Sequence, residues 1–82
     1  MPLFMDVHDV DHIDPDALAS AHERDLEVQA RYGVDYQRYW FSEEQGRVFC
    51  LVDAPDAEAA EAVHREAHGL LADEIVPVRE GT

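Results

Sequence analysis

Cysteine is scarce in this sequence, which has Cys50 alone among its 82 residues. A single cysteine excludes an internal disulfide and a zinc or iron–sulfur site built mainly from thiolates, because such sites need several cysteines in one chain. A metal ion bound here must therefore be held by nitrogen and oxygen donors. Cys50 itself lies in an apolar run, where burial raises the pKa of a thiol, and we interpret it as a structural residue.

Positive charge is also scarce, with six basic residues against nineteen acidic ones and a formal net charge of −13. This charge repels phosphate backbones and anionic lipids and attracts cations, so nucleic-acid and membrane partners are not expected. No apolar run approaches the roughly 20 residues of a membrane-spanning helix, and residues 1–8 lack the pattern of a signal peptide. We therefore expect a cytoplasmic protein. The four glycines stand alone, which excludes a glycine-rich phosphate loop.

The apolar residues that are present form short periodic runs. Leu3, Met5 and Val7 alternate with more polar residues, as in a strand, whereas Asp14-Pro15 and Gly33 are typical of the start and end of a helix. Pro77 cannot donate to a sheet ladder, which favours an edge strand. The same reasoning along the chain predicts strands at 3–8, 34–41, 48–52 and 74–78, and helices at about 15–32 and 57–68.

This order predicts an α+β, ferredoxin-like βαββαβ fold, in which a four-stranded antiparallel sheet carries two helices on one face. Residues 1–82 are expected to form a single domain. The opposite face of the sheet would then expose part of the 48–52 strand and residues such as Phe4, Tyr39 or Trp40. Exposed apolar patches usually mark interfaces, so we predict a homodimer formed through the open sheet face.

The first predicted helix carries His22 and Asp25 at or beside its apolar stripe. Residues three apart are neighbours on a helix, so the two side chains could bind one metal ion, or Asp25 could accept a hydrogen bond from the imidazole. Both alternatives remain open from the residues alone.

The second predicted helix carries His64 and His68, four residues apart. That spacing lets two imidazoles on one helical face bind a single ion, with Glu61 and Glu66 nearby as oxygen donors. The alternative is that the two histidines lie in the last turn and interact with the helix dipole.

Asp6 and His8 share one face of the first predicted strand, which we assign to the uncovered side of the sheet together with Phe4. A site at the subunit interface could form there, although a hydrogen-bonded polar end to the strand is the simpler interpretation. His12, in the following loop, is expected to be solvated.

Several segments resemble a small actinobacterial family of unknown function that includes a nickel-binding protein. They are Phe4-Met5-Asp6-Val7-His8, Ala21-His22-x-x-Asp25-Leu26, Val48-Phe49-Cys50-Leu51, Ala54 to Ala59 and Ala72-Asp73-Glu74-Ile75. The resemblance implies a dimeric ferredoxin-like protein that binds nickel through histidine nitrogen and water or other oxygen ligands. The candidate metal ligands carried over by it are His8, His22, Asp25, His64 and His68.

The leading hypothesis is thus a dimer that binds nickel for sequestration or homeostasis rather than catalysis. Imidazole and carboxylate donors also accept zinc, cobalt and copper, so these residues do not select the metal. The alternative is a dimeric α/β-barrel enzyme, in which Tyr36, Tyr39, Trp40 and His8 line an apolar pocket between two sheets. A purely structural interaction module is a third possibility.

Overall fold

The computed structural model describes residues 2–81, which form one four-stranded antiparallel sheet with two α-helices. The strand order β2-β3-β1-β4 places β1 and β3 in the middle and is that of a ferredoxin-like fold, as predicted. The elements are β1 (Leu3–Asp9), α1 (Pro15–Val28), a short 3-10 helix (Gln29–Tyr32), β2 (Asp35–Ser42), β3 (Arg47–Asp53), α2 (Ala57–Ala67) and β4 (Glu74–Val78).

The helix ends follow the local sequence. The Asp14 carboxylate accepts hydrogen bonds from two N–H groups of the first turn of α1, and the Asp56 carboxylate accepts one from the N–H of Ala59 in α2. Gly33 ends the first helical segment with a φ of +66°, the left-handed region that glycine enters without strain. The predicted 15–32 helix is therefore correct in extent, but its last four residues tighten into a 3-10 turn.

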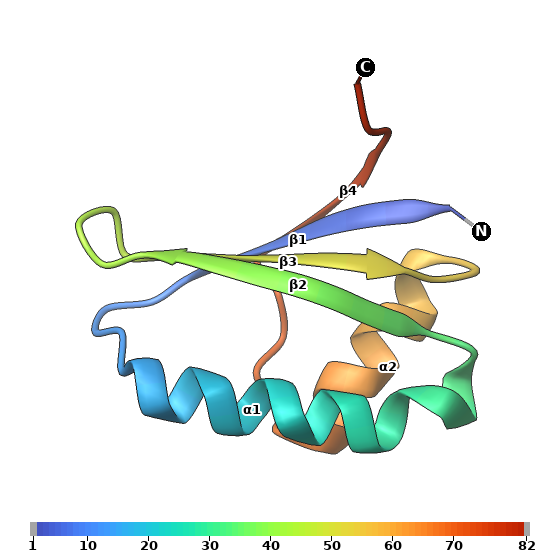
Figure 1. The fold of residues 1–82 in the computed structure, drawn as a ribbon, viewed down its shortest axis with the longest axis horizontal. Helices are drawn as coiled ribbons and strands as arrows, with labels where there is room; N and C mark the ends of the chain where they lie inside the picture. The colour runs from blue at the N-terminus through green and yellow to red at the C-terminus, as the bar shows by residue number, and fades with distance from the viewer. Residues whose placement is uncertain (1, 82) are drawn as a thin grey trace.

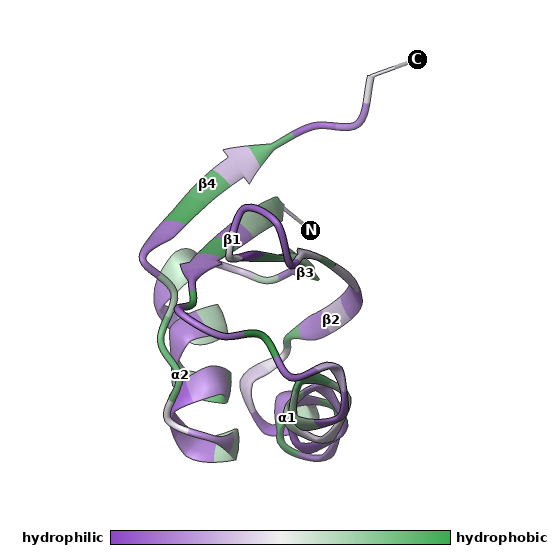
Figure 2. Cartoon of the chain, turned by 90° about the vertical axis from the view of Figure 1, so that its left-hand side faces the viewer, coloured by the Kyte–Doolittle hydropathy of each residue, from purple (hydrophilic) through white to green (hydrophobic). Residues whose placement is uncertain are grey.

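Both helices cover the same face of the sheet and lie side by side beneath it (Figures 1 and 2). The core between them is built from small and β-branched residues, with the ring of Tyr36 as its largest apolar member. None of the described helices is long and apolar enough to cross a membrane.

The structure reverses the predicted orientation of β1. Asp6 is fully buried and contacts α2, so the face that carries Phe4, Asp6 and His8 lies under the helices rather than on the open side. Tyr39 also packs on the helical side. The prediction was wrong because both alternating sets of β1 contain apolar residues, and the apolar pattern alone does not say which set faces the helices.

The open face of the sheet is apolar along its two central strands, while the outer strands place Arg38 in register with Leu51 and Glu74 in register with Val7. In the strand register Val7 lies opposite Phe49, which lies opposite Trp40, and Met5 lies opposite Leu51. These side chains are partly exposed, and Trp40 is 47% exposed. Only Trp40 of the three aromatic residues expected here is on this face.

Candidate metal centre

His64, on α2, lies at the centre of a buried polar cluster and is only 2% exposed. Its Nδ1 is 2.9 Å from Oδ1 of Asp25 on α1, and its Nε2 is 3.0 Å from Oδ2 of Asp6 on β1. Each ring nitrogen therefore faces a carboxylate from a different element of the fold.

His68 is the residue that follows α2, one turn after His64, and it contacts the same carboxylate of Asp25. Its Nε2 is 3.1 Å from Asp25 Oδ1 and 3.1 Å from His64 Nδ1. The backbone N–H of Leu70 donates to Nδ1 of His68 at 3.0 Å, which holds the ring from the other side. Asp25, His64 and His68 thus bring three potential metal ligands together, and we call them the triad.

A second group shares His64 and lies deeper, against the sheet. It consists of Asp6, His8, Cys50 and His64, whose potential ligand atoms all lie within 4.8 Å of one another. Nε2 of His8 is 3.2 Å from Asp6 Oδ1, yet the geometry there is not that of a hydrogen bond. A buried carboxylate oxygen with no well-formed donor is uncommon and favours a site that accepts a proton or a cation.

Tyr36, on β2, fixes the position of this cluster. Its hydroxyl donates to Asp6 Oδ2 at 2.8 Å, and its ring stacks on that of His64 with centroids 4.5 Å apart. The side chain of Gln29 accepts the backbone N–H of Tyr36. The His64 ring is therefore held between a stacked ring and two carboxylates.

Burial and charge pairing act in opposite directions on these groups. Burial lowers the pKa of His64, but the hydrogen bonds to Asp25 and Asp6 outweigh it and raise that pKa to about 9. Burial likewise raises the pKa values of Asp6 and Asp25, whereas their histidine partners hold both below the usual range. Without a metal ion, His64 is thus an imidazolium between two carboxylates. Burial and the nearby Asp6 raise the pKa of Cys50, which supports its interpretation as a structural residue.

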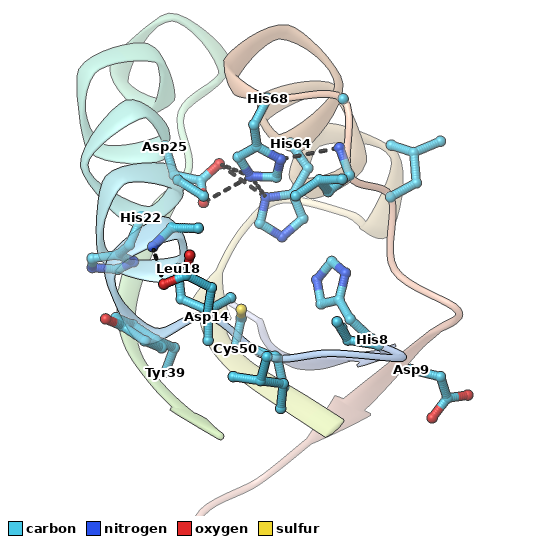
Figure 3. Close-up of a pocket in the computed structure, with 18 of the residues that line it drawn as sticks. His8, Asp9, Asp14, Leu18, His22, Asp25, Tyr39, Cys50, His64 and His68 are labelled. Atoms are coloured by element: carbon cyan, nitrogen blue, oxygen red, sulfur yellow. Dashed lines mark hydrogen bonds and ion pairs between the residues drawn. The ribbon is translucent and has the colours of Figure 1, made fainter. Parts of the chain in front are cut away.

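A cleft of about 530 Å³ opens from the triad between α1, the sheet and residues 69–73. Asp25, His64 and His68 group together between the two helices, and His22 lies beside Tyr39 (Figure 3). Leu18 lines the same cleft, as do Leu70 and Leu71 of the loop after α2. The cleft therefore has apolar side chains next to the triad, and four further carboxylates, those of Asp9, Asp11, Asp14 and Asp73, line it as well.

The structure brings four of the five predicted ligands into the two groups. His8 belongs to the deeper group, Asp25 and His68 belong to the triad, and His64 belongs to both. His8 arrives from the helical face rather than from a subunit interface. His22 lines the cleft, but its ring packs on Tyr39 with centroids 4.8 Å apart, while Asp25 is hydrogen-bonded to the α2 histidines. The suggested oxygen donor Glu66 instead binds Arg31 and Tyr32.

Sequence reasoning did not name Cys50 or Tyr36 as members of the cluster, and it considered Asp6 with His8 only as a possible site at a subunit interface. Asp6 was detectable, since it shares a strand face with His8, but that face was assigned to the wrong side. The residues predicted to line an intersheet pocket are also divided, because Tyr36 is buried under the helices and Trp40 lies on the open face.

The fold and the cluster together define a ferredoxin-like α+β protein with a candidate metal centre between its helices and its sheet. The chain belongs to the family described as nickel responsive protein SCO4226-like, which matches residues 4–78. It is similar to the crystal structure of SCO4226 from Streptomyces coelicolor A3(2), with 40% identity and a TM-score of 0.89 over 98% of this chain and 99% of that one. The resemblance noted in the sequence is thus confirmed. A search of curated proteins gives no match.

Proposed function

We propose that this protein binds a divalent transition metal ion, nickel as the description of its family suggests, through Asp25, His64 and His68. The observation that carries the proposal is the spacing of the triad. Its three ligand atoms, Asp25 Oδ1, His64 Nδ1 and His68 Nε2, form a triangle with sides of 2.9, 3.1 and 3.1 Å.

That spacing fits three neighbouring ligands of one ion. Ligands at about 2.1 Å from a metal lie about 3.0 Å apart in an octahedral arrangement and about 3.4 Å apart in a tetrahedral one. The three atoms are thus close enough together that they would hold one divalent ion between them. Imidazole nitrogen suits nickel as a ligand, and a carboxylate offsets part of its charge.

The hydrogen bonds around the triad support metal binding at His64. With Nε2–H donating to Asp6, the neutral ring presents an unprotonated Nδ1 to the ion, which is the usual role of a carboxylate behind a metal-bound histidine. At His68 the arrangement must change. A metal on Nε2 places the proton on Nδ1, where the Leu70 N–H now donates, so the loop after α2 has to release that bond.

The other predicted ligands have different parts in this proposal. His8 contacts Asp6 and would act behind His64, whereas His22 contacts only the edge of the cleft. Binding by His8 or His22 themselves stays a prediction. Sequestration rather than catalysis also stays a prediction, as does a cytoplasmic location.

We further propose that two copies associate through the open face of the sheet. Support comes from its central apolar residues, Val7, Phe49 and Trp40, which lie in register across three strands. The triad lies on the opposite side of the sheet, so the metal-free protein should remain a dimer.

Titration of nickel by calorimetry into protein purified without a histidine tag tests the proposal. We expect His68→Ala to weaken binding at least about 10-fold and His64→Ala/His68→Ala about 100-fold or more. His12→Ala is the matched control, because His12 is exposed and outside both groups. Circular dichroism must show that each variant is folded. Unchanged affinity in folded His68→Ala would remove the triad as the site.

His8→Ala and His22→Ala complete the series. The proposed ligand set predicts that His22→Ala binds nickel as the wild type does and that His8→Ala loses less than His68→Ala. A loss with His22→Ala as large as with His68→Ala would move the site toward Tyr39 and the edge of the cleft.

A further inference from the structure

The deeper group of potential ligands supplies only His64 to the nickel site proposed above. We call its four members, Asp6, His8, Cys50 and His64, the deep group. Asp6 and His8 share one face of β1, and Cys50 lies opposite Asp6 in the register of β3. The four ligand atoms all lie within 4.8 Å of one another, close enough to surround one ion. The sheet itself therefore brings together three of the four donors.

The buried carboxylate of Asp6 points to a ligand at this place. Its Oδ2 accepts the hydroxyl of Tyr36 and faces Nε2 of His64. Its Oδ1 is buried as well and accepts no hydrogen bond from the residues that the structure describes, although Nε2 of His8 is 3.2 Å away. Buried carboxylate oxygens normally have a partner. An unpartnered oxygen beside an imidazole and a thiol is what a bound cation would explain.

The donors of the deep group select a class of ion. Thiolate is a ligand of zinc and other soft ions, and four-coordinate zinc sites accept thiolate, imidazole and carboxylate together. A divalent ion bound to the Asp6 carboxylate and a Cys50 thiolate has no net charge, which suits a place where both residues are buried. Without an ion the Cys50 thiol keeps its proton and is a structural residue, whereas a coordinated ion removes that proton.

The deep group is open to ions from the cleft. His8, Cys50 and His64 line that cleft together with the four further carboxylates described above. Carboxylates attract cations and repel anions, so the charge of the cleft favours the approach of a metal ion.

His64 connects the deep group to the triad. A neutral imidazole has one free nitrogen and one N–H, so its ring can bind an ion on one side only. With nickel on Nδ1, the Nε2–H group donates to Asp6, and with an ion on Nε2, the Nδ1–H group donates to Asp25. The two carboxylates lie 3.0 and 2.9 Å from these nitrogens, so the fold accommodates either tautomer.

We propose that the deep group is a second metal site, which binds zinc through its four residues, and that zinc there and nickel at the triad exclude each other because both need His64. The zinc site stands on the deep group alone, and only the exclusion rests on the nickel site proposed above. By linkage, each ion weakens the binding of the other by the same factor.

Cobalt(II), titrated into protein without a histidine tag and followed by absorption, tests the deep site. Cobalt occupies zinc sites and, unlike zinc, gives a charge-transfer band in the near ultraviolet when it binds a thiolate. Cys50 is the only thiol in the chain, so this band reports on it alone. We expect the band in the wild type and its loss on addition of zinc.

Cys50→Ser and His68→Ala form a matched pair, because the first changes only the deep group and the second only the triad. Cys50→Ser should lose the cobalt band and bind nickel as the wild type does. His68→Ala should keep the band and bind nickel more weakly. Cys50→Ala is a second variant without any donor atom, and circular dichroism must show that all three are folded.

Nickel calorimetry with and without one equivalent of zinc tests the exclusion. In the wild type, zinc should lower the nickel affinity on the order of 10-fold or more. In Cys50→Ser this effect should disappear, whereas direct competition of zinc for the triad would persist there.

The outcomes separate the two sites. A wild type without the cobalt band, or a band that persists in folded Cys50→Ser, overturns the deep site. Loss of the band in folded His68→Ala overturns its independence from the triad. A nickel affinity that zinc does not change, or that zinc lowers equally in Cys50→Ser, overturns the exclusion. Absence of nickel binding in the wild type overturns the nickel site, and the cobalt spectrum then still decides the deep site.

Discussion

Strand β1 inverts the usual distribution of polar and apolar residues, whereas β3 contributes Val48 and Val52 to the apolar core on the covered face. Along β1, Asp6 and His8 point under the helices, while Met5 and Val7 point outward to the uncovered face. The covered side thus holds charges that would be costly if unpaired, and the open side holds apolar surface that would be costly if left in water. In the function proposed above, the covered face binds an ion and the open face binds a second copy of the chain.

Substitutions on the two faces should also have different effects on stability and association. The covered side depends on an ion network in which His64 compensates two buried carboxylates, so removal of one member leaves charge without a partner. The open side depends on area and shape, so its substitutions should act on association and leave the fold of each chain largely intact. Four predictions test this contrast.

The largest effect is expected from His64→Ala in the metal-free protein. It leaves Asp6 and Asp25 buried without their shared cation, which should lower the free energy of unfolding by about 3–5 kcal/mol. Urea denaturation followed by circular dichroism measures the change. His12→Ala, at an exposed position, should stay within about 0.5 kcal/mol of the wild type. Equal midpoints for the two variants would mean that the network contributes nothing to stability.

The next effect concerns the open face. Phe49→Asp places a charge between Val7 and Trp40 and should weaken dimerisation at least about 100-fold, which corresponds to about 3 kcal/mol. Light scattering across a range of concentrations measures this loss. The same variant should bind nickel as the wild type does. Joint loss of dimer and metal binding would show that the two faces are not independent.

A smaller effect is expected from pH on the metal-free protein. The pKa of His64 rises from its ordinary value of 6.5 to about 9 on folding, so its contribution is complete below pH 6.5 and disappears as pH rises through 9. Asp6 and Asp25 have lowered pKa values, so theirs is present above pH 3.8 and lost as pH falls further. Stability should therefore be greatest between these limits.

The rise from pH 6.5 to 9 should cost on the order of 1–3 kcal/mol of unfolding free energy. Urea titrations at a series of pH values measure it, with Phe49→Asp as the comparison because it leaves the network untouched. A stability that stays level up to pH 9 in both proteins would contradict the imidazolium assigned to His64.

The smallest effect is a proton count on metal binding. At pH 7.5 the metal-free His64 is protonated, because its pKa is about 9, and nickel at Nδ1 must displace that proton. Calorimetry in buffers of different ionisation enthalpy should give about one proton released per nickel ion, and nickel affinity should rise with pH up to 9. The same heat of binding in every buffer would place the ion elsewhere.

The sequence was sufficient for the elements of the fold and for part of the site. Helix-capping and strand-limiting residues such as Asp14-Pro15, Gly33 and Pro77 affect only the few residues next to them. The bounds of helices and strands were therefore predictable almost to the residue. The His64 and His68 pair followed from helical spacing alone. The wrong face of β1 arose because an alternating strand specifies two faces without saying which one the helices cover.

Local spacing by itself determined which residues share a face, and for this reason His22 and Asp25 were considered as a pair. The tertiary structure decided which other elements each face contacts. Because α1 packs against α2, Asp25 is hydrogen-bonded to His64 and His68 rather than to His22. The register of β1 beside β3 places Asp6 beneath α2. Contacts between residues as far apart as Asp6 and His64 depend on how whole elements pack, and no local pattern in the chain encodes that choice.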